Sequence, residues 1–180
     1  MLNSKRYALG KMGEMYLSAE IAVVVGILLI WAILSIAGAT LFGLSTGQAI
    51  GGGFVAMLLY WVADIIHNLS HATAARQTGY PMRGIHFGFL AIFGIAVYPD
   101  DEPNLPAAVH IRRAIGGPIG SMITALIFGA IALALRSGGG LAWLLTAFFA
   151  WTNLLVFTIG ALTPLGFTDG STILHYWGKR

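Results

Sequence analysis

Two histidines four residues apart, His67 and His71, stand inside an otherwise apolar stretch of the chain. On a helix this spacing puts both imidazoles on one face, where they can offer nitrogen ligands to one metal ion. In the pattern His-Glu-x-x-His, the residue after the first histidine is the glutamate that acts as general base. Here that position is held by Asn68, whose amide cannot take a proton at neutral pH. The pattern therefore indicates a metalloprotease-like site from which the base is missing.

A carboxylate precedes this pair in the same stretch. Asp64 lies about one turn before His67, and positions 64, 67, 68 and 71 fall on one helical face. Ionisable groups inside a membrane span are costly and are usually functional. This grouping favours a site, with a hydrogen-bonded polar seam between helices as the alternative. Asp64 is also a remote candidate for a surrogate base, because it would have to reach a bound metal past its own helix backbone.

The composition places these residues in a membrane. Of 180 residues, 57% are hydrophobic and 9% are charged, whereas soluble domains carry about 25% charged residues. The chain has no cysteine, which excludes disulfides and thiolate metal sites. The net charge of +3 is too small to indicate nucleic-acid binding. We expect the partners to be the lipid bilayer and other transmembrane proteins.

Four apolar stretches are long enough for a helix of about 20 residues, which crosses a membrane. They cover residues 21–44, 49–75, 115–135 and 141–162. We therefore expect an all-α polytopic membrane protein with about four transmembrane helices.

The segment between the second and third spans, residues 79–110, is the least regular part of the chain. Its run 85–93 is apolar and aromatic but too short to span a membrane. We expect a short membrane-associated β-hairpin or re-entrant segment there, buried against the helices. The acidic residues and proline at 100–103 predict a solvated turn.

Lysine and arginine residues set the orientation of the spans. Nine of the ten lie in segments on one predicted side, and Arg136 alone lies on the other. We expect a single membrane domain over residues 1–180, with both termini in the cytoplasm. The N-terminal segment 1–20, the segment 79–110 and the tail 163–180 then lie on the cytoplasmic side.

This topology brings three candidate ligands to one membrane depth. The second and fourth spans both run toward the cytoplasm, so His67 and His71 lie near the end of one, and Asp169 follows the other within two turns. Two imidazoles and a carboxylate form a donor set that zinc accepts. The alternative for Asp169 is a role as N-cap of a helix in the tail.

Other polar residues are interpreted as structural. Gly116 and Gly120, at GxxxG spacing, predict close packing of two helices. The hydroxyl and amide side chains of the fourth span are expected to make interhelical hydrogen bonds: Thr152, Asn153 and Thr158. The remaining histidines are expected to be interfacial or structural: His86, His110 and His175.

These blocks, in this order, resemble the site-2 protease family of intramembrane zinc metalloproteases, especially its small bacterial members. Residues 67–81 are similar to the family's His-Glu-Leu-Ser/Gly-His helix and its Ala-Arg…Gly-x-Pro exit. Residues 85–103 are similar to its β-segment and Glu-Pro turn, 114–118 to its Ala-Gly-Pro helix start, and 162–170 to its Asn-Leu-x-Pro…Leu-Asp-Gly block. The resemblance covers the chain from about residue 49 to its end.

The resemblance implies a site-2-protease-like core in which His67, His71 and Asp169 hold zinc, a vestigial site without metal being the alternative. It also implies that the family's general-base glutamate is replaced by Asn68. General acid–base catalysis contributes about 10²–10⁴-fold to a rate. The resemblance therefore implies a proteolytically inactive or impaired homologue, with no catalytic residue assigned.

Three functions follow as hypotheses. The leading one is a zinc-binding, site-2-protease-like protein of the prokaryotic cytoplasmic membrane that cleaves poorly or not at all and binds transmembrane segments of a partner. The second is an accessory structural subunit of a larger respiratory or photosynthetic membrane complex. The third is an active intramembrane metalloprotease with a surrogate base.

Overall fold

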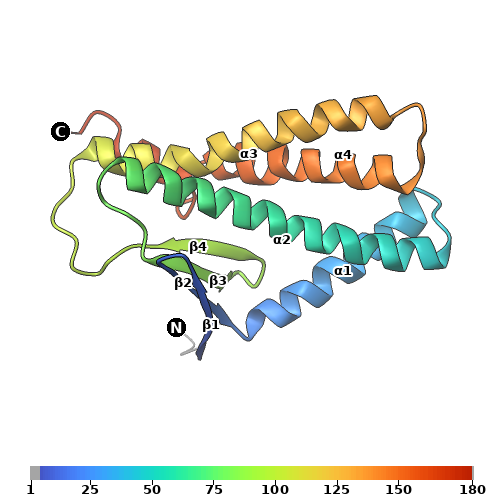
Figure 1. Cartoon of the computed structure of the whole chain (residues 1–180), viewed down its shortest axis with the longest axis horizontal. Coiled ribbons are helices and arrows are strands. Elements are labelled where there is room, and N and C mark those ends of the chain that lie inside the picture. Colours follow the sequence, from blue (N-terminus) through green and yellow to red (C-terminus); the bar gives the residue numbers. More distant parts are fainter. Residues whose placement is uncertain (1–4, 180) are drawn as a thin grey trace.

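The structure is a computed structural model that describes residues 5–179. Long helices lie side by side along one axis, and the strands gather at one end (Figure 1). The described helices are α1 (Ala22–Leu41), α2 (Thr46–Gln77), α3 (Ala107–Leu135), α4 (Gly140–Leu154), the π-helix η1 (Leu155–Gly160) and α5 (Asp169–Tyr176). The described strands are β1 (Arg6–Met12), β2 (Met15–Glu20), β3 (Gly84–Phe89) and β4 (Phe93–Val97).

Within residues 5–179, four helical segments are long and apolar enough to cross a membrane: α1, α2, α3, and α4 with η1. This confirms the four predicted spans, with shifts at their ends. The second begins at Thr46 because Ser45 and Gln48 form a capping box, each side chain accepting the other residue's backbone N–H. The third begins at Ala107, directly after Pro106, instead of at position 115.

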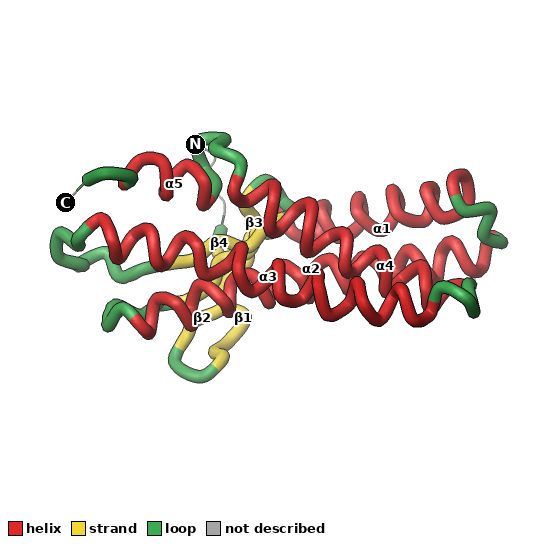
Figure 2. Tube along the Cα trace, turned by 90° about the horizontal axis from the view of Figure 1, so that it is seen from above, coloured by secondary structure: helices red, strands yellow, loops and turns green. Residues whose placement is uncertain are grey.

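The long helix α2 is the centre of the bundle, because it packs against α1, α3 and α4. Figures 1 and 2 place the α1–α2 and α3–α4 connections at one end of the long axis, and the sheet and α5 at the other. The C-terminal half of α2 therefore runs toward the sheet. It carries four buried polar side chains: Asp64, His67, Asn68 and His71.

The described strands form one sheet in the order β1-β2-β3-β4. β3 and β4 pair antiparallel, which makes the hairpin that was one of the two structures expected for this segment. The N-terminal pair β1 and β2 was not predicted, so the all-α expectation was too narrow. β1 is exposed along nearly its whole length. A strand with no buried face needs no alternation of apolar and polar residues, which is the sequence signal for a strand.

The fourth span is not a regular α-helix to its end. In η1, Thr158 Oγ1 lies 2.9 Å from the main-chain oxygen of Asn153, five residues earlier, and 3.4 Å from that of Pro118 on α3. The expected interhelical bond is thus present for Thr158, whereas Asn153 donates within its own helix. Phe157 of η1 is buried, and its ring centroid lies 5.6 Å from that of His67. π-turns of this kind often occur at functional sites.

Two of the remaining histidines join elements of the fold. His86 on β3 lies between two residues of β2, with Nδ1 2.9 Å from Ser18 Oγ and Nε2 3.3 Å from Glu20 Oε1. His110 on α3 stacks on Tyr176 of α5, with ring centroids 4.1 Å apart. These contacts agree with the structural role expected from the sequence, and the second holds α5 against α3.

Candidate metal centre

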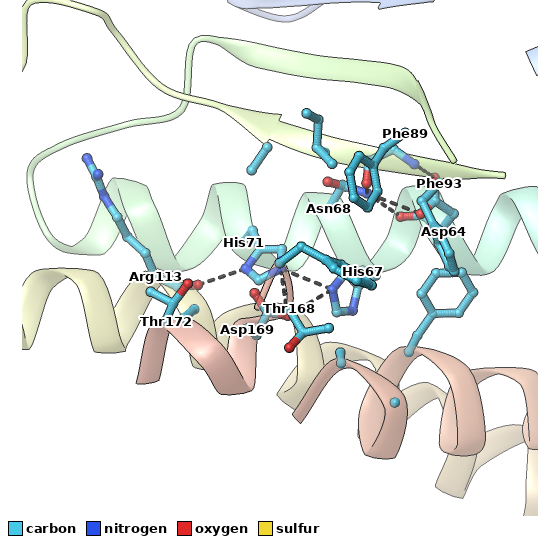
Figure 3. A pocket seen from close by; sticks show the side chains of 18 of the residues that line it. Asp64, His67, Asn68, His71, Phe89, Phe93, Arg113, Thr168, Asp169 and Thr172 are labelled. Carbon is cyan, nitrogen blue, oxygen red and sulfur yellow. Dashed lines mark hydrogen bonds and ion pairs between the residues drawn. The ribbon is translucent and has the colours of Figure 1, made fainter. Parts of the chain in front are cut away.

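The two histidines of α2 and the first residue of α5 meet at one point (Figure 3). The Nε2 atoms of His67 and His71 lie 3.0 Å apart, and Asp169 Oδ2 lies 3.3 Å from each of them. Both imidazoles are buried and the carboxylate is partly buried. The three residues therefore form a group that could hold a metal ion.

The geometry of this triangle fits zinc. Zinc bonds of about 2.0–2.1 Å at tetrahedral angles put neighbouring ligand atoms about 3.3 Å apart. The sides of the triangle are 3.0, 3.3 and 3.3 Å. Two imidazole nitrogens and one carboxylate oxygen also form the donor set of zinc sites that keep a fourth position open.

The other nitrogen of each imidazole is held by α3. His71 Nδ1 lies 2.8 Å from the main-chain oxygen of Arg113, and His67 Nδ1 lies 3.1 Å from Ser121 Oγ. A carbonyl oxygen can only accept, so in this bond His71 Nδ1 carries the proton and its Nε2 lone pair is free to face the shared point. Such partners orient metal-binding histidines and contribute to metal affinity.

Arg113 is itself buried and is held by the segment between α2 and α3. Its guanidinium makes two hydrogen bonds to the carboxylate of Glu102, at 2.5 and 3.0 Å, and one to the main-chain oxygen of Tyr80 at 2.6 Å. It also lies 4.1 Å from the ring centroid of Tyr98. Burial raises the pKa of Tyr98 to about 12, so the cation packs on a neutral ring.

This clamp limits one expectation from the sequence. The predicted solvated turn is present, with Asp100, Asp101 and Pro103 exposed, but Glu102 is partly buried and fixes Arg113. Because the main-chain oxygen of Arg113 accepts from His71, the turn helps to orient a candidate ligand. The role of Arg113 was missed because it acts through its backbone, which carries no residue-specific signal.

A glycine of α3 makes the closest approach to the candidate ligands. A Cβ on Gly117 would lie 2.7 Å from His67 Nε2 and nearer still to His71 Nε2. Any side chain there would overlap the atoms that face the shared point. Gly116 and Gly120 instead pack against α2, as their spacing predicted. From the sequence, Gly117 belonged only to the block similar to the Ala-Gly-Pro helix start, and no contact with the histidines was predicted for it.

Asp169 points at the imidazoles and does not cap the tail helix. The N-cap of α5 is Thr168, so the N-cap alternative for Asp169 is wrong. Thr168 Oγ1 donates to the main-chain oxygen of Thr163 at 2.5 Å and lies 3.0 Å from Ser171 Oγ, which holds the turn before Asp169. Burial would raise the pKa of Asp169, but the hydrogen bonds with the two imidazoles outweigh it and hold this pKa below its usual range.

His67, His71 and Asp169 are called the candidate metal-ligand group, or metal-ligand group, below. Asp64 and Asn68 lie beside this group and face the sheet (Figure 3). Asp64 Oδ2 accepts a hydrogen bond from the backbone N–H of Gly94 on β4 at 2.8 Å. Asn68 Nδ2 lies 2.9 Å from the main-chain oxygen of Asp64. All four polar positions line one cavity, as expected from their shared face. Within it the histidines bond to α3 and lie beside Asp169, whereas Asp64 and Asn68 bond to β4. A role for Asp64 as base would require it to leave its bond to β4.

A cavity of about 550 Å³ lies beside the candidate ligands. His67, His71 and Asp169 line one part of it, and Phe93 and Ile95 of β4 line another. Apart from the polar groups described above, its lining is mostly apolar. The arrangement can hold an apolar segment next to a metal ion.

Comparison with solved structures identifies the fold. The chain is similar to the site-2 protease from Methanocaldococcus jannaschii, with a TM-score of 0.64 and 21% sequence identity over 94% of this chain and 70% of that chain. No protein-family model matches the chain, and no curated protein matches it in sequence. Together with the four apolar helices, the similarity shows a membrane protein with a site-2-protease-like fold.

Proposed function

We propose that this chain is a site-2-protease-like membrane protein that binds zinc through His67, His71 and Asp169 and is proteolytically inactive or impaired. The proposal rests on the contrast between the three potential ligand atoms and the amide beside them. Three potential ligand atoms lie 3.0–3.3 Å from one another, while the residue after the first histidine is an amide, Asn68. The likeness to a site-2 protease supports this reading at the level of the fold.

Zinc held by these three residues would supply a Lewis acid. The main-chain oxygen of Arg113 and the hydroxyl of Ser121 hold the two Nδ1 atoms, so that both Nε2 atoms face the shared point. Asp169 adds the negative charge that a divalent cation favours. Asn68 has no carboxylate with which to move a proton. The lack of a general base at this position is expected to lower the rate of proteolysis by about 10²–10⁴-fold.

The cavity beside the ligands supports a binding role. Its volume of about 550 Å³ suits a few residues of a partner's transmembrane segment, and its apolar wall on β4 suits docking of that segment against Phe93 and Ile95. The charge asymmetry supports an orientation with the sheet and α5 on the cytoplasmic side of the membrane. The resemblance to the small bacterial members of the family suggests the prokaryotic cytoplasmic membrane.

Metal analysis of the purified full chain tests the site. We expect about one zinc ion per chain after gentle purification from native membranes. The double variant His67→Ala, His71→Ala is expected to lose it. His175→Ala is the matched control, because His175 is exposed and lies beside Lys179, away from the candidate ligands. Equal zinc in the wild type and the double variant would refute the metal site.

A tagged single-span membrane protein tests the activity and the docking role. We expect it to stay uncleaved and to co-purify with the wild-type chain. Ile95→Arg is expected to reduce this co-purification, because it puts a charge on the apolar wall of the cavity. Cleavage by the wild type that stops on addition of a chelator would overturn the inactive state and favour an active protease.

A further inference from the structure

A second hydrogen-bonded group lies on the side of α2 that faces the sheet. It consists of Asp64 and Asn68, each 1% exposed, and the backbone of Gly94. Asp64 Oδ2 accepts from the Gly94 N–H at 2.8 Å, and Asn68 Nδ2 lies 3.4 Å from the Gly94 oxygen. Two side chains of α2 therefore engage both main-chain groups of one residue of β4.

Gly94 presents these groups at the outer edge of its strand. It pairs with Phe87 of β3, and in the described sheet β4 has a neighbouring strand on that side only. In antiparallel sheets the N–H and C=O of one residue point to the same side of the strand, so Gly94 turns both away from β3. A Cβ at this position would lie 2.7 Å from Asp64 Oδ2. The close approach of strand and carboxylate thus requires glycine.

Position 68 is surrounded by hydrogen-bond acceptors. Around Asn68 Nδ2 lie the main-chain oxygen of Asp64 at 2.9 Å, and Asp64 Oδ1 and the Gly94 oxygen at 3.4 Å each. The two N–H groups of the amide satisfy this environment. An ionised glutamate would bring oxygen against oxygen here. A protonated glutamate could donate but would then be unable to accept a proton.

We propose that Asp64, Asn68 and Gly94 form a tether that fixes β4 on α2 and commits position 68 to a hydrogen-bond donor. The amide at position 68, which replaces the base, then depends on the carboxylate at position 64. Exchanging the two residue types keeps one carboxylate and one amide on adjacent turns of α2. The inference deepens the proposed function, and only its proteolysis arm rests on that function.

A double-mutant cycle on the full chain in detergent tests the tether. Asn68→Asp keeps the side-chain shape but removes the donor and adds a second carboxylate, so we expect the melting temperature to fall by about 5 °C or more. The exchange variant Asp64→Asn, Asn68→Asp is expected to recover part of that loss, because it removes the repulsion between two carboxylates. The recovery is incomplete because the main-chain oxygens of residues 64 and 94 still face position 68. Zinc content is expected to stay near that of the wild type in both, because no candidate ligand is changed.

Additive losses in the exchange variant, or an unchanged melting temperature in Asn68→Asp, would overturn the tether. If Asn68→Asp yields no folded protein, the yield of folded exchange variant replaces the melting temperature as the readout. Recovery of folded protein then supports the inference, and failure to recover it overturns the inference.

Proteolysis by glutamate variants separates this inference from the proposed function. We expect Asn68→Glu alone to leave the single-span substrate uncleaved, and Asp64→Asn with Asn68→Glu to cleave it at least about tenfold faster. Equal cleavage by both would overturn the inference, because position 68 would then accept a carboxylate beside Asp64. Thermal coupling without any cleavage supports the tether and counts against the missing base as the cause of inactivity.

Discussion

Two buried polar groups use neighbouring positions of the same stretch of α2, and they differ in how their donors and acceptors are matched. In the tether, the N–H groups of Asn68 and Gly94 are matched by oxygen acceptors. In the candidate metal-ligand group, two imidazole nitrogens and a carboxylate oxygen lie 3.0–3.3 Å from one another, and the outer nitrogens are held by α3. The tether thus pairs donors with acceptors, whereas the candidate metal-ligand group brings together the imidazole and carboxylate donor set that a divalent cation accepts.

The largest effect on zinc affinity is expected when the negative charge of Asp169 is removed from the metal-ligand group. Asp169→Asn is expected to lower zinc affinity more than about 100-fold, since even changes to residues that only orient ligands cost 10–100-fold. Competition with a zinc-binding dye measures this. Asp101→Asn, at an exposed acidic residue, is the control and is expected to have no effect. Equal affinity in the two variants would mean that Asp169 is not a ligand.

A methyl group placed against the ligand atoms is expected to act almost as strongly. Gly117→Ala should lower zinc affinity by about 100-fold, because its Cβ overlaps the Nε2 atoms of both histidines. Gly129→Ala makes the same change on the same helix where a Cβ meets nothing within 4 Å. We expect this control to bind zinc normally. Matching zinc affinities for the two variants would contradict the placement of Gly117 at the site.

Loss of a bond to the outer nitrogen of His67 is expected to have a smaller effect. Ser121→Ala removes the hydroxyl that lies 3.1 Å from His67 Nδ1, and we expect zinc affinity to fall about 10-fold. Thr124→Ala removes a hydroxyl of α3 that donates to its own helix and should leave affinity unchanged. The same dye competition reports both. A Ser121→Ala variant with wild-type affinity would remove this bond from the account of the site.

The smallest effect is expected in the melting temperature, when the metal is removed from a variant that also lacks the tether. Chelation should lower the melting temperature of the wild type by about 5 °C, as expected when a ligand that binds the folded state is removed. The same shift, within about 2 °C, is expected in Asn68→Leu if the tether and the metal-ligand group contribute independently. Differential scanning fluorimetry measures both shifts. A chelation shift that vanishes in Asn68→Leu would show that the two groups act as one.

Much of the metal-ligand group could be predicted without a structure. The spacing of His67 and His71 puts them on one helical face, and the charge asymmetry puts Asp169 at their depth. The direction of Asp64 and Asn68 was less accessible, because it depends on where β4 lies. Gly117 lay within the block similar to the Ala-Gly-Pro helix start, but its contact with the histidines could not be predicted. Arg113 and Ser121 carried no signal, since they act on the outer nitrogens of the histidines.

Hydropathy reveals the order and number of the spans, and helical periodicity reveals that His67 and His71 share a face. The candidate ligand types and the absence of a glutamate at position 68 are read directly from the chain. The convergence of Asp169 on the imidazoles, the clamp of Glu102 on Arg113 and the tether to Gly94 arise only when distant segments pack together. Periodicity constrains neighbours along one helix. Contacts between segments depend on how helices and strands dock, and a local sequence pattern does not encode that docking.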